Sequence, residues 1–184
     1  NKSEEIIKDE YNYLSDKEKF FIKSFKKFEK IILFCATEAI PTSLLKAIKL
    51  SQKKNNWIWL IRLHPRHGNF NLVKKKLDEF KISMKNVHIH EPTKMNLLLL
   101  LKKSTHIIID QSSVCLDAAY FNKPAICLAA NKNMFKTWSN LKVCKFTVNH
   151  KQIIKIISSN KKSFCYKKMK SSCKESELKK IIKN

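Results

Sequence analysis

The sequence predicts an α/β domain in which a doubly wound, Rossmann-like parallel sheet carries helices on both faces. Short apolar runs of strand length alternate with helical patterns, and short polar loops join them. Most of these runs are apolar throughout, as is typical of parallel strands that are buried on both faces. The chain has 184 residues, 43% of them hydrophobic, which suits one domain with its own core.

The first third of the chain illustrates this alternation. Two helices are expected within 3–28, joined at Ser15, because Ser15 and Glu18 have the spacing of a capping box. A buried strand follows at 31–36, and Pro41 then opens a helix that runs through Leu50, because proline is favoured in a first helical turn. The next strand begins with Trp-Ile-Trp-Leu-Ile, a continuous apolar run, and the strand is expected over 57–63.

The same alternation continues to residue 158. A short strand at 87–90 is expected to stop at Glu91-Pro92, because the residue before a proline is restricted. The later strands are expected at 105–109, 124–129 and 143–148. The helices that separate and follow the strands are expected at 72–80, 96–103, 114–121, 135–141 and 152–158. We therefore divide the chain into an N-terminal helical segment at 1–29, a folded domain at 30–160 and a basic, partly helical tail at 161–184.

The net charge and the spacing of the cysteines argue against several classes of function. The formal net charge is +23, but the lysines are spread along helix faces such as 74–76 and form no basic cluster interleaved with aromatic residues. Nucleic-acid binding is therefore only an alternative. The six cysteines contain no C-x-x-C pair, and Cys35, Cys115 and Cys127 lie in apolar runs, so neither zinc nor a disulfide framework is indicated. The His-x-His at 88–90 lacks a third metal ligand.

No membrane or export segment is recognisable. No apolar stretch approaches the roughly 20 residues that a membrane span needs. The chain begins with Asn-Lys-Ser rather than Met and has no signal-peptide pattern, so we expect a segment of a longer protein with a cytoplasmic location.

The segment 62–68, Arg-Leu-His-Pro-Arg-His-Gly, is the first candidate site. It contains both arginines, Arg62 and Arg66, and the only glycine of the chain, together with His64 and His67. It comes where a buried parallel strand ends, which is where open α/β sheets bind ligands. A guanidinium can hold a phosphate with two parallel hydrogen bonds. The alternative is that Pro65 and Gly68 only form a turn and that the charges are solvated.

The second candidate site is Ser112-Ser113, directly after another strand. Hydroxyls and free backbone N–H groups at a helix start, together with the helix dipole, suit a phosphate. Asp117 follows one helical turn later, where its carboxylate can accept hydrogen bonds from ribose hydroxyls. Glu91, at the end of the third strand, is a candidate contact for a base or sugar. As alternatives, one serine is an N-cap, Asp117 complements the helix dipole, and Glu91 only precedes a strand-ending proline.

Several common sites are excluded by the residues present. A chain with a single glycine has neither a G-x-G-x-x-G nor a Walker A loop. The serine pair also lacks the flanking glycines of a hydrolase nucleophile elbow.

Three motifs together carry a resemblance to a known family. They are Arg-Leu-His-Pro at 62–65, Asp-Gln-Ser-Ser-Val-Cys-Leu-Asp at 110–117 and Lys-Pro-Ala-Ile at 123–126. Over 30–158, this pattern resembles the C-terminal, donor-binding half of GT-B glycosyltransferase-like enzymes of surface polysaccharide synthesis. It is most similar to the CDP-glycerol glycerophosphotransferase family. Related His-Pro and Ser-Ser motifs occur in bacterial sialyltransferases and capsular Kdo transferases, which also use cytidine-nucleotide donors.

The resemblance implies roles for particular residues. His64, Ser112 and Ser113 would bind the donor phosphate, and Asp117 would bind the ribose, while Arg62 and Arg66 are added here as phosphate ligands because of their charge. The segment 30–160 would then be the nucleotide-donor-binding domain. The implied activity is transfer of a sugar or glycerol phosphate, with a nucleotide-activated donor, expected to carry cytidine, as substrate and with no cofactor and no metal.

A GT-B enzyme has two such domains, and its acceptor site and usual catalytic base lie in the N-terminal one. Because 184 residues hold only one, we expect a missing acceptor domain or a partner chain, and the catalytic residues stay unknown. Peripheral contact with an anionic membrane at its inner face is also expected. Two alternatives stay open, namely a sugar-nucleotide 2-epimerase-like domain and a non-catalytic basic module that binds nucleic acid or a membrane surface. The missing Gly-Gly after the serine counts against the epimerase.

Overall fold

The computed structural model describes residues 9, 11–37, 39–66, 68–110, 112–129 and 143–159. These residues form a six-stranded sheet with the order β3-β2-β1-β4-β5-β6, in which every neighbouring pair is parallel. The strands are β1 (Lys30–Ala36), β2 (Trp57–Leu63), β3 (Val87–His88), β4 (His106–Ile109), β5 (Ala125–Cys127) and β6 (Lys145–Phe146). The predicted doubly wound, Rossmann-like parallel sheet is confirmed, with β1 and β4 at its centre.

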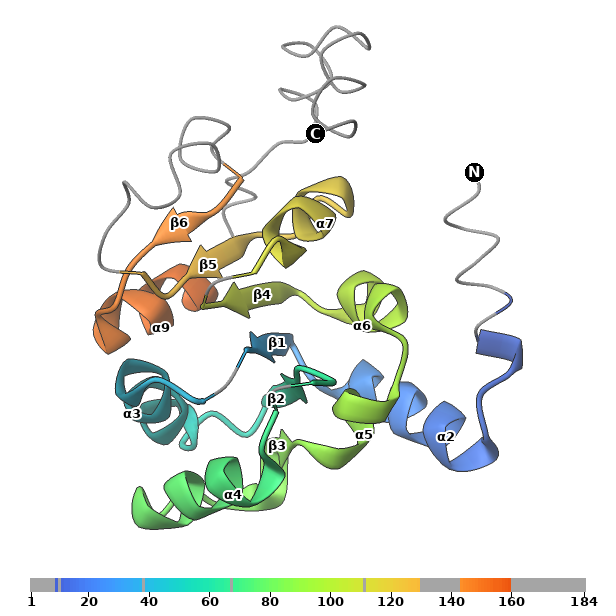
Figure 1. Ribbon diagram of the computed structural model, residues 1–184, viewed down its shortest axis with the longest axis horizontal. Coiled ribbons are helices and arrows are strands. Elements are labelled where there is room, and N and C mark those ends of the chain that lie inside the picture. Colours follow the sequence, from blue (N-terminus) through green and yellow to red (C-terminus); the bar gives the residue numbers. More distant parts are fainter. Residues whose placement is uncertain are drawn as a thin grey trace, which may run out of the picture.

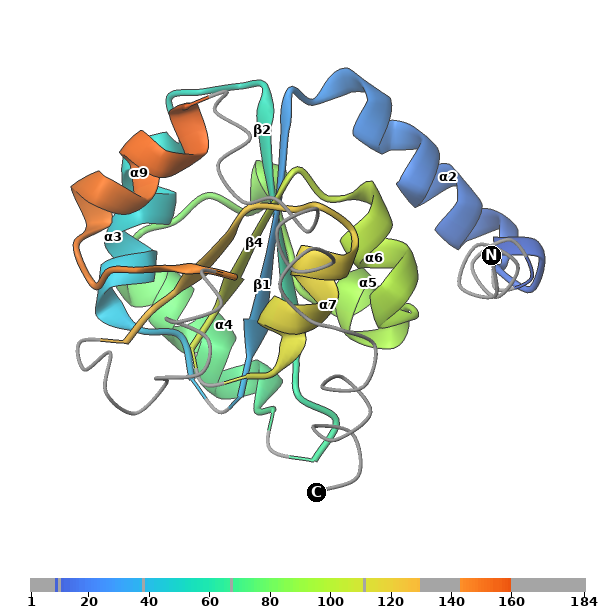
Figure 2. The same cartoon turned by 90° about the horizontal axis from the view of Figure 1, so that it is seen from above.

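Helices cover both faces of this sheet (Figure 1). One face carries α3 (Thr42–Ser51), α4 (Phe70–Glu79) and α9 (His150–Ser158). The other face carries α2 (Asp16–Ser24), η1 (Phe25–Lys27), α5 (His90–Lys94), α6 (Leu97–Lys103) and α7 (Val114–Tyr120). A further short helix, η2 (Met84–Asn86), precedes β3. Figure 2 shows the same division from above, with α3 and α9 on one side of the strands and α2, α6 and α7 on the other.

The two faces bury separate hydrophobic clusters because side chains alternate along each strand. In β2, Trp57, Trp59, Ile61 and Leu63 face α3 and α4, whereas Ile58 and Leu60 face α6. All seven residues of β1 are buried. Burial on both faces explains why the strands read as continuous apolar runs in the sequence.

Ser15 starts α2 with the predicted capping box. The Glu18 backbone N–H donates to the Ser15 hydroxyl oxygen at 3.3 Å, and the Ser15 backbone N–H donates to Glu18 Oε2 at 2.9 Å. Ile22 and Phe25 then pack into the α6–α7 side of the core. The described part of the N-terminal segment is therefore attached to the sheet through these side chains and through the partly buried Tyr11, Leu14, Phe21 and Phe28.

Several predicted boundaries are wrong at the edges of the sheet. β3 has two residues instead of four, and Glu91 and Pro92 belong to α5 rather than to a strand end. Pro92 is tolerated there because the first turn of a helix does not use its backbone N–H groups. β6 is likewise shorter than the predicted 143–148, and β5, next to it, is shorter than the predicted 124–129. Pro41 is the N-cap of α3 and lies just outside that helix.

Some predicted elements lie outside the described residues, namely the helix at 135–141, the tail from 161 and most of the helix before Ser15. Within the described part of the chain, no helix has both the length and the apolar character that crossing a membrane requires.

Candidate functional site

The three strands β2, β1 and β4 end at the same level of the sheet, and the loops that follow them lie side by side. Cys35 of β1 is paired with Arg62 of β2 on one side and with Ile109 of β4 on the other. The strand order also reverses between β1 and β4, which makes this edge the topological switch point where doubly wound sheets bind ligands. Because neighbouring strands are about 4.8 Å apart, the ends of β2 and β4 lie roughly 10 Å from each other across β1. Both predicted sites therefore open at the same edge.

The loop after β2 is a tight turn that presents His64. Its backbone carbonyl accepts a hydrogen bond from the Gly68 N–H at 2.8 Å, and its Nδ1 accepts one from the Arg66 N–H at 3.2 Å. With Nδ1 acting as an acceptor, the neutral ring carries its proton on Nε2 and donates from there. A Cβ atom at position 68 would lie 2.5 Å from Leu63 Cβ and 2.7 Å from the His64 carbonyl oxygen. Only glycine therefore fits this turn, and His64 is exposed on it.

Arg62 has a structural role that the sequence did not reveal. Its guanidinium Nη1 donates to the Thr93 carbonyl oxygen at 3.0 Å, at the end of α5. The group is half-buried, and this burial lowers the pKa of Arg62. A guanidinium has five N–H donors, so one bond to Thr93 is compatible with the predicted phosphate role. Arg66 is exposed on the loop, and its contact with His64 is made by the backbone.

Ser112 and Ser113 differ in their hydrogen bonding at the start of α7. Ser113 occupies the N-cap position but makes no side-chain capping bond. The Ser112 hydroxyl oxygen accepts the Val114 N–H instead, at 3.3 Å. Ser113 is thus an N-cap by position only, with an exposed side chain, and Ser112, the residue before it, accepts one of the free N–H groups at the helix start. Because α7 has only seven residues, hydroxyls and backbone N–H groups matter more here than a helix dipole.

Asp117 lies one turn further along α7, and partial burial raises the pKa of its carboxyl group. The pKa of the Cys35 thiol shows which charges surround the strand ends. Burial raises that pKa to about 12, Arg62 opposes the rise, and Asp110 and Asp117 add to it. Arg62 and Ile109 are the register partners of Cys35, and Asp110 follows Ile109 directly, while α7, which carries Asp117, begins four residues after Asp110 at the same edge of the sheet.

Thr37 and Asp110 join β1 to β4 at the switch point, and sequence reasoning missed them as site residues. The Thr37 hydroxyl donates to Asp110 Oδ2 at 2.6 Å, and the Thr37 backbone N–H points to the same oxygen at 3.4 Å. Their position directly after predicted strands was a usable signal. What the sequence did not reveal is that β1 and β4 are neighbours.

Glu91 lies beside His88. Its Oε2 lies 4.0 Å from Nδ1 of His88, whose ring packs edge-on against Phe21 at a centroid distance of 5.0 Å. Burial lowers the pKa of His88, and Glu91 opposes this shift. Glu91 thus lies beside His88, whose ring contacts Phe21 of α2.

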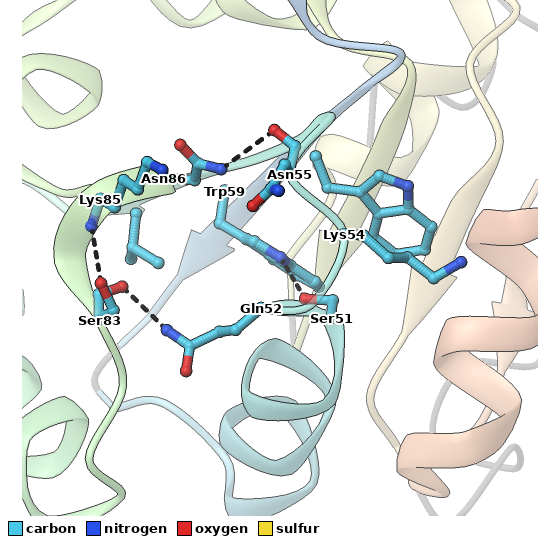
Figure 3. Close-up of a pocket in the computed structure, with 10 residues that line it drawn as sticks. Ser51, Gln52, Lys54, Asn55, Trp59, Ser83, Lys85 and Asn86 are labelled. Carbon is cyan, nitrogen blue, oxygen red and sulfur yellow. Dashed lines mark hydrogen bonds between the residues drawn. The ribbon is translucent and has the colours of Figure 1, made fainter.

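Among the hollows formed by the described residues, one of about 480 Å³ lies between β6 and α9, beside Phe146 and Gln152, and two others lie at opposite edges of the sheet. An open hollow of about 600 Å³ lies at the switch point beside Thr37 and Asp110. A pocket of about 60 Å³ lies at the other edge, where the strands begin (Figure 3). Its polar groups bind one another: Trp59 Nε1 donates to Ser51 Oγ at 2.9 Å, Gln52 Nε2 to the Ser83 carbonyl at 3.0 Å and Asn86 Nδ2 to the Asn55 carbonyl at 3.3 Å. The small pocket therefore serves packing, and the switch-point edge is the candidate site. Among the described residues, no group of three or more His, Cys, Asp or Glu side chains is arranged to hold a metal ion.

Comparisons with known proteins find solved structures that have a similar fold. No protein-family model and no curated protein sequence matches the chain. Solved structures do match, among them a UDP-GlcNAc 2-epimerase from Neisseria meningitidis bound to UDP-GlcNAc, at 18% identity and a TM-score of 0.56, over 97% of this chain and 51% of that one. The UDP-GlcNAc 2-epimerase from Methanocaldococcus jannaschii matches at 20% identity and a TM-score of 0.58, over 81% and 44%. The chain has the fold of a GT-B-like half.

This similarity supports only the fold, because the sequence identities are low. The chain also spans only about half, or less, of the length of the structures that it matches. The wall teichoic acid polymerase TagF matches at a TM-score of 0.47 and 14% identity, over 78% of this chain and 38% of that one, which is too weak to carry an argument.

Proposed function

We propose that this chain is the donor-binding half of a GT-B-type transferase, which moves a sugar or glycerol phosphate from a nucleotide-activated donor during surface polysaccharide synthesis. One observation carries the proposal. His64, the serine pair at 112–113 and Asp117, which are the residues of the motif resemblance, follow separate strands or lie on α7 and all belong to one sheet edge. That edge is the topological switch point, where a nucleotide fits the fold.

The residues suit different parts of such a donor. His64 Nε2 and the Ser112 and Ser113 hydroxyls are hydrogen-bond donors for a diphosphate, and hydrogen bonds to a charged group are among the strong ones. Asp117 accepts hydrogen bonds from ribose hydroxyls. Because β1 lies between the two loops, a diphosphate held by both would cross its end at Thr37.

Arg62 and Arg66 add positive charge to this edge and are part of the proposal. Glu91 enters only as a candidate contact for the base or sugar, and its position against His88 makes it the weakest member of the set.

A GT-B-like chain of half length needs its other half for chemistry. Transfer requires an acceptor held within a few ångströms of the reacting atom of the donor, together with a base that activates it. We assign both to a missing N-terminal domain or a partner chain. No residue of this chain is assigned as catalytic.

A 2-epimerase-like domain is the second candidate, because the structures that match the fold include UDP-GlcNAc 2-epimerases. The two candidates differ in the nucleotide that they bind. A cytidine nucleotide is the expected ligand of the transferase half, whereas an epimerase half would prefer a uridine nucleotide. Calorimetric titration of the chain with CMP, CDP-glycerol, UDP and UDP-GlcNAc separates them, and a preference for UDP would overturn the transferase assignment.

The binding residues are tested with His64→Ala. We expect it to weaken CDP-glycerol binding by about 1.5–3 kcal/mol, the range for a hydrogen bond to a charged group, and to leave the binding of free cytidine almost unchanged. His90→Ala is the matched control, because His90 is also exposed but lies on α5. Equal losses for cytidine and CDP-glycerol would show that His64 only supports the fold.

Peripheral contact with an anionic membrane is also part of the proposal, since the net charge of +23 favours it. Co-sedimentation with phosphatidylserine vesicles should therefore be strong at low salt. It should fall when the ionic strength rises from about 0.1 M to about 1 M, because the Debye length shortens from about 10 Å to about 3 Å. Equal sedimentation with neutral phosphatidylcholine vesicles would contradict it.

A further inference from the structure

The hollow between β6 and α9 lies at the lateral edge of the sheet, beyond β5 (Figure 1). Its volume of about 480 Å³ is within the range of small-molecule sites. Residues 144–147 form one wall, and Gln152, Lys155 and Ile156, which share one face of α9, form the other. The described residues that line it include none of the switch-point hollow and none of the proposed donor site.

The polar groups of this hollow are mainly hydrogen-bond donors. The hydroxyl of Thr147, which is 7% exposed, donates to Gln152 Oε1 at 2.7 Å, and its oxygen accepts the Asn149 backbone N–H at 3.1 Å. The Gln152 amide thus turns its oxygen towards Thr147, and its two N–H groups are left to bond elsewhere. Lys145 and Lys155 add ammonium groups, each with three donors and no acceptor. A ligand in this hollow therefore has to supply acceptor atoms.

The charge of the hollow is positive, and its lining adds no acid. Lys145 and Lys155 are the charged side chains among the described residues that line it. A hydrogen bond with Cys115 raises the pKa of the Cys144 thiol to about 12, so this thiol is neutral at pH 7. The surrounding elements β5, β6, α9 and α3 also contain no aspartate or glutamate, and the sequence has none at 118–174. A surface of a single sign concentrates anions.

A phosphate monoester fits these groups better than a carboxylate does. It carries a charge of about −1.5 to −2 at pH 7 and three strong acceptor oxygens, which match two ammonium groups and one amide. A carboxylate carries one charge and would leave one ammonium group without a counter-charge. The half-buried Phe146 and Ile156 add apolar residues to the lining for the organic part of an ester.

We infer that the hollow between β6 and α9 binds a phosphate monoester, whose phosphate is held by Lys145, Lys155 and Gln152. An ammonium group has three donors, so each lysine can bond a phosphate oxygen in addition to the contacts that it already makes. This site is separate from the switch-point edge, so the inference does not depend on the proposed function.

The test is a titration of the full chain, followed by NMR chemical shifts in about 0.15 M salt, where non-specific attraction by the net charge is screened. Phenyl phosphate, benzoate and benzyl alcohol share one ring and differ in charge, from about −2 through about −1 to neutral at pH 7. We expect saturable binding of phenyl phosphate, at least about tenfold tighter than that of benzoate or benzyl alcohol. Inorganic phosphate should bind more weakly than phenyl phosphate because it has no apolar part.

Two results of this titration would overturn the inference. One is the absence of saturable phenyl phosphate binding, and the other is equal affinity for benzoate, which would show that a single charge suffices. Equal affinity for inorganic phosphate would overturn the assignment of the ligand as an ester.

Variants on α9 locate the binding. Lys155→Gln should weaken phenyl phosphate binding by at least about tenfold, whereas Lys151→Gln, one helical turn earlier at an exposed position outside the lining, should leave it unchanged. Gln152→Glu keeps the oxygen that accepts from Thr147 but exchanges the amide donor for a carboxylate oxygen, so it should also weaken binding by at least about tenfold. Equal losses for Lys151→Gln and Lys155→Gln would show binding by overall charge and would overturn the inference. All three variants should bind CDP-glycerol as the unchanged chain does, so the proposed function fails or holds in a separate titration.

A lipid headgroup can supply the same chemical group as a soluble ester. Phosphatidic acid presents a phosphate monoester, whereas phosphatidylserine presents a phosphate diester and a carboxylate. Displacement of phenyl phosphate by phosphatidic acid vesicles, but not by phosphatidylserine vesicles of equal total charge, would support the inference with a lipid as the source. Displacement by neither vesicle would support it with a soluble ester as the source. Equal displacement by both vesicles would show attraction by charge alone and would overturn it.

Discussion

Gly68 closes the turn that carries His64, so under the proposed function the one glycine of the chain positions a binding residue. Its N–H closes the turn onto the His64 carbonyl, and a Cβ atom there would lie 2.5 Å from Leu63 Cβ. We expect Gly68→Ala to open the turn, to lower the free energy of unfolding by about 1–3 kcal/mol, as overpacking does, and to weaken CDP-glycerol binding as much as His64→Ala does. Chemical denaturation and calorimetry measure the two effects. Lost stability with unchanged CDP-glycerol affinity would show that the turn does not position His64.

His106 makes the stability of the chain depend on pH. It is buried at the start of β4, and burial, with help from Lys30 and Lys123, lowers its pKa to about 4. In the unfolded chain the pKa is about 6.5, so between these values the unfolded state binds more protons than the folded state. Stability should therefore be complete above about pH 6.5 and should fall by up to about 3 kcal/mol as the pH drops to about 4.

The measurement is urea unfolding at several pH values between 4 and 7.5, compared with His106→Gln. The variant should lose a large part of the slope, and the remainder belongs to groups such as His88, whose pKa is also lowered by burial. Identical slopes for the two proteins would contradict the assignment to His106.

At the scale of elements, Thr93 holds α5 against β2. Its hydroxyl oxygen accepts the Leu63 backbone N–H at 3.2 Å and its hydroxyl donates to the Ile89 carbonyl at 2.7 Å, while its carbonyl accepts Arg62 Nη1 at 3.0 Å. Thr93→Val keeps the shape but leaves the Leu63 N–H without this acceptor, which should cost about 1–3 kcal/mol of unfolding free energy. Thr93→Ser should restore most of it. Since Leu63 precedes His64, hydrogen exchange at Leu63 and at the loop should rise in the valine variant alone.

The accuracy with which each strand was predicted depended on how the strand is buried in the sheet. β1 and β2 were placed to within a residue, because a strand buried on both faces leaves a continuous apolar run. β3, β5 and β6 were overestimated: β3 and β6 are edge strands, whose length depends on one neighbour, and β5 lies next to β6, which offers it only two paired residues. Pro92 was read as the end of a strand although it also fits the first turn of a helix.

In the candidate site, residues with a local sequence signal could be predicted, whereas contacts that depend on the tertiary fold could not. His64, Ser112 and Asp117 could be predicted as site residues because each has a local signal, such as the end of an apolar run or the start of a helix. Thr37 and Asp110 are 73 residues apart in the sequence, and their hydrogen bond depends on strand order alone. The bond that Ser112 accepts from Val114 and the bond from Arg62 to Thr93 also depend on local geometry that one sequence does not fix.

At the scale of the whole molecule, binding and turnover should be separable. The chain matches half or less of the similar structures, so we expect purified residues 1–184 to bind a cytidine nucleotide and to transfer nothing to any acceptor. Release of CMP from CDP-glycerol in the presence of a glycerol phosphate acceptor is the assay. Turnover by this chain alone would contradict the assignment of acceptor site and base to another domain. Restored turnover on addition of the missing half would support it.

The central position of β1 sets the order in which the chain can be assembled on the ribosome. β2, its first partner, is made about twenty residues later, but β4, its second partner, is made only about seventy residues later, after roughly 4–14 s of synthesis at about 5–20 residues per second. During that interval one edge of β1 has backbone groups without their final partner, and such an edge invites pairing with another chain. The same strand order that creates the proposed binding crevice therefore exposes the nascent protein to aggregation, and a chaperone that covers the β1 edge until β4 emerges would raise its folding yield.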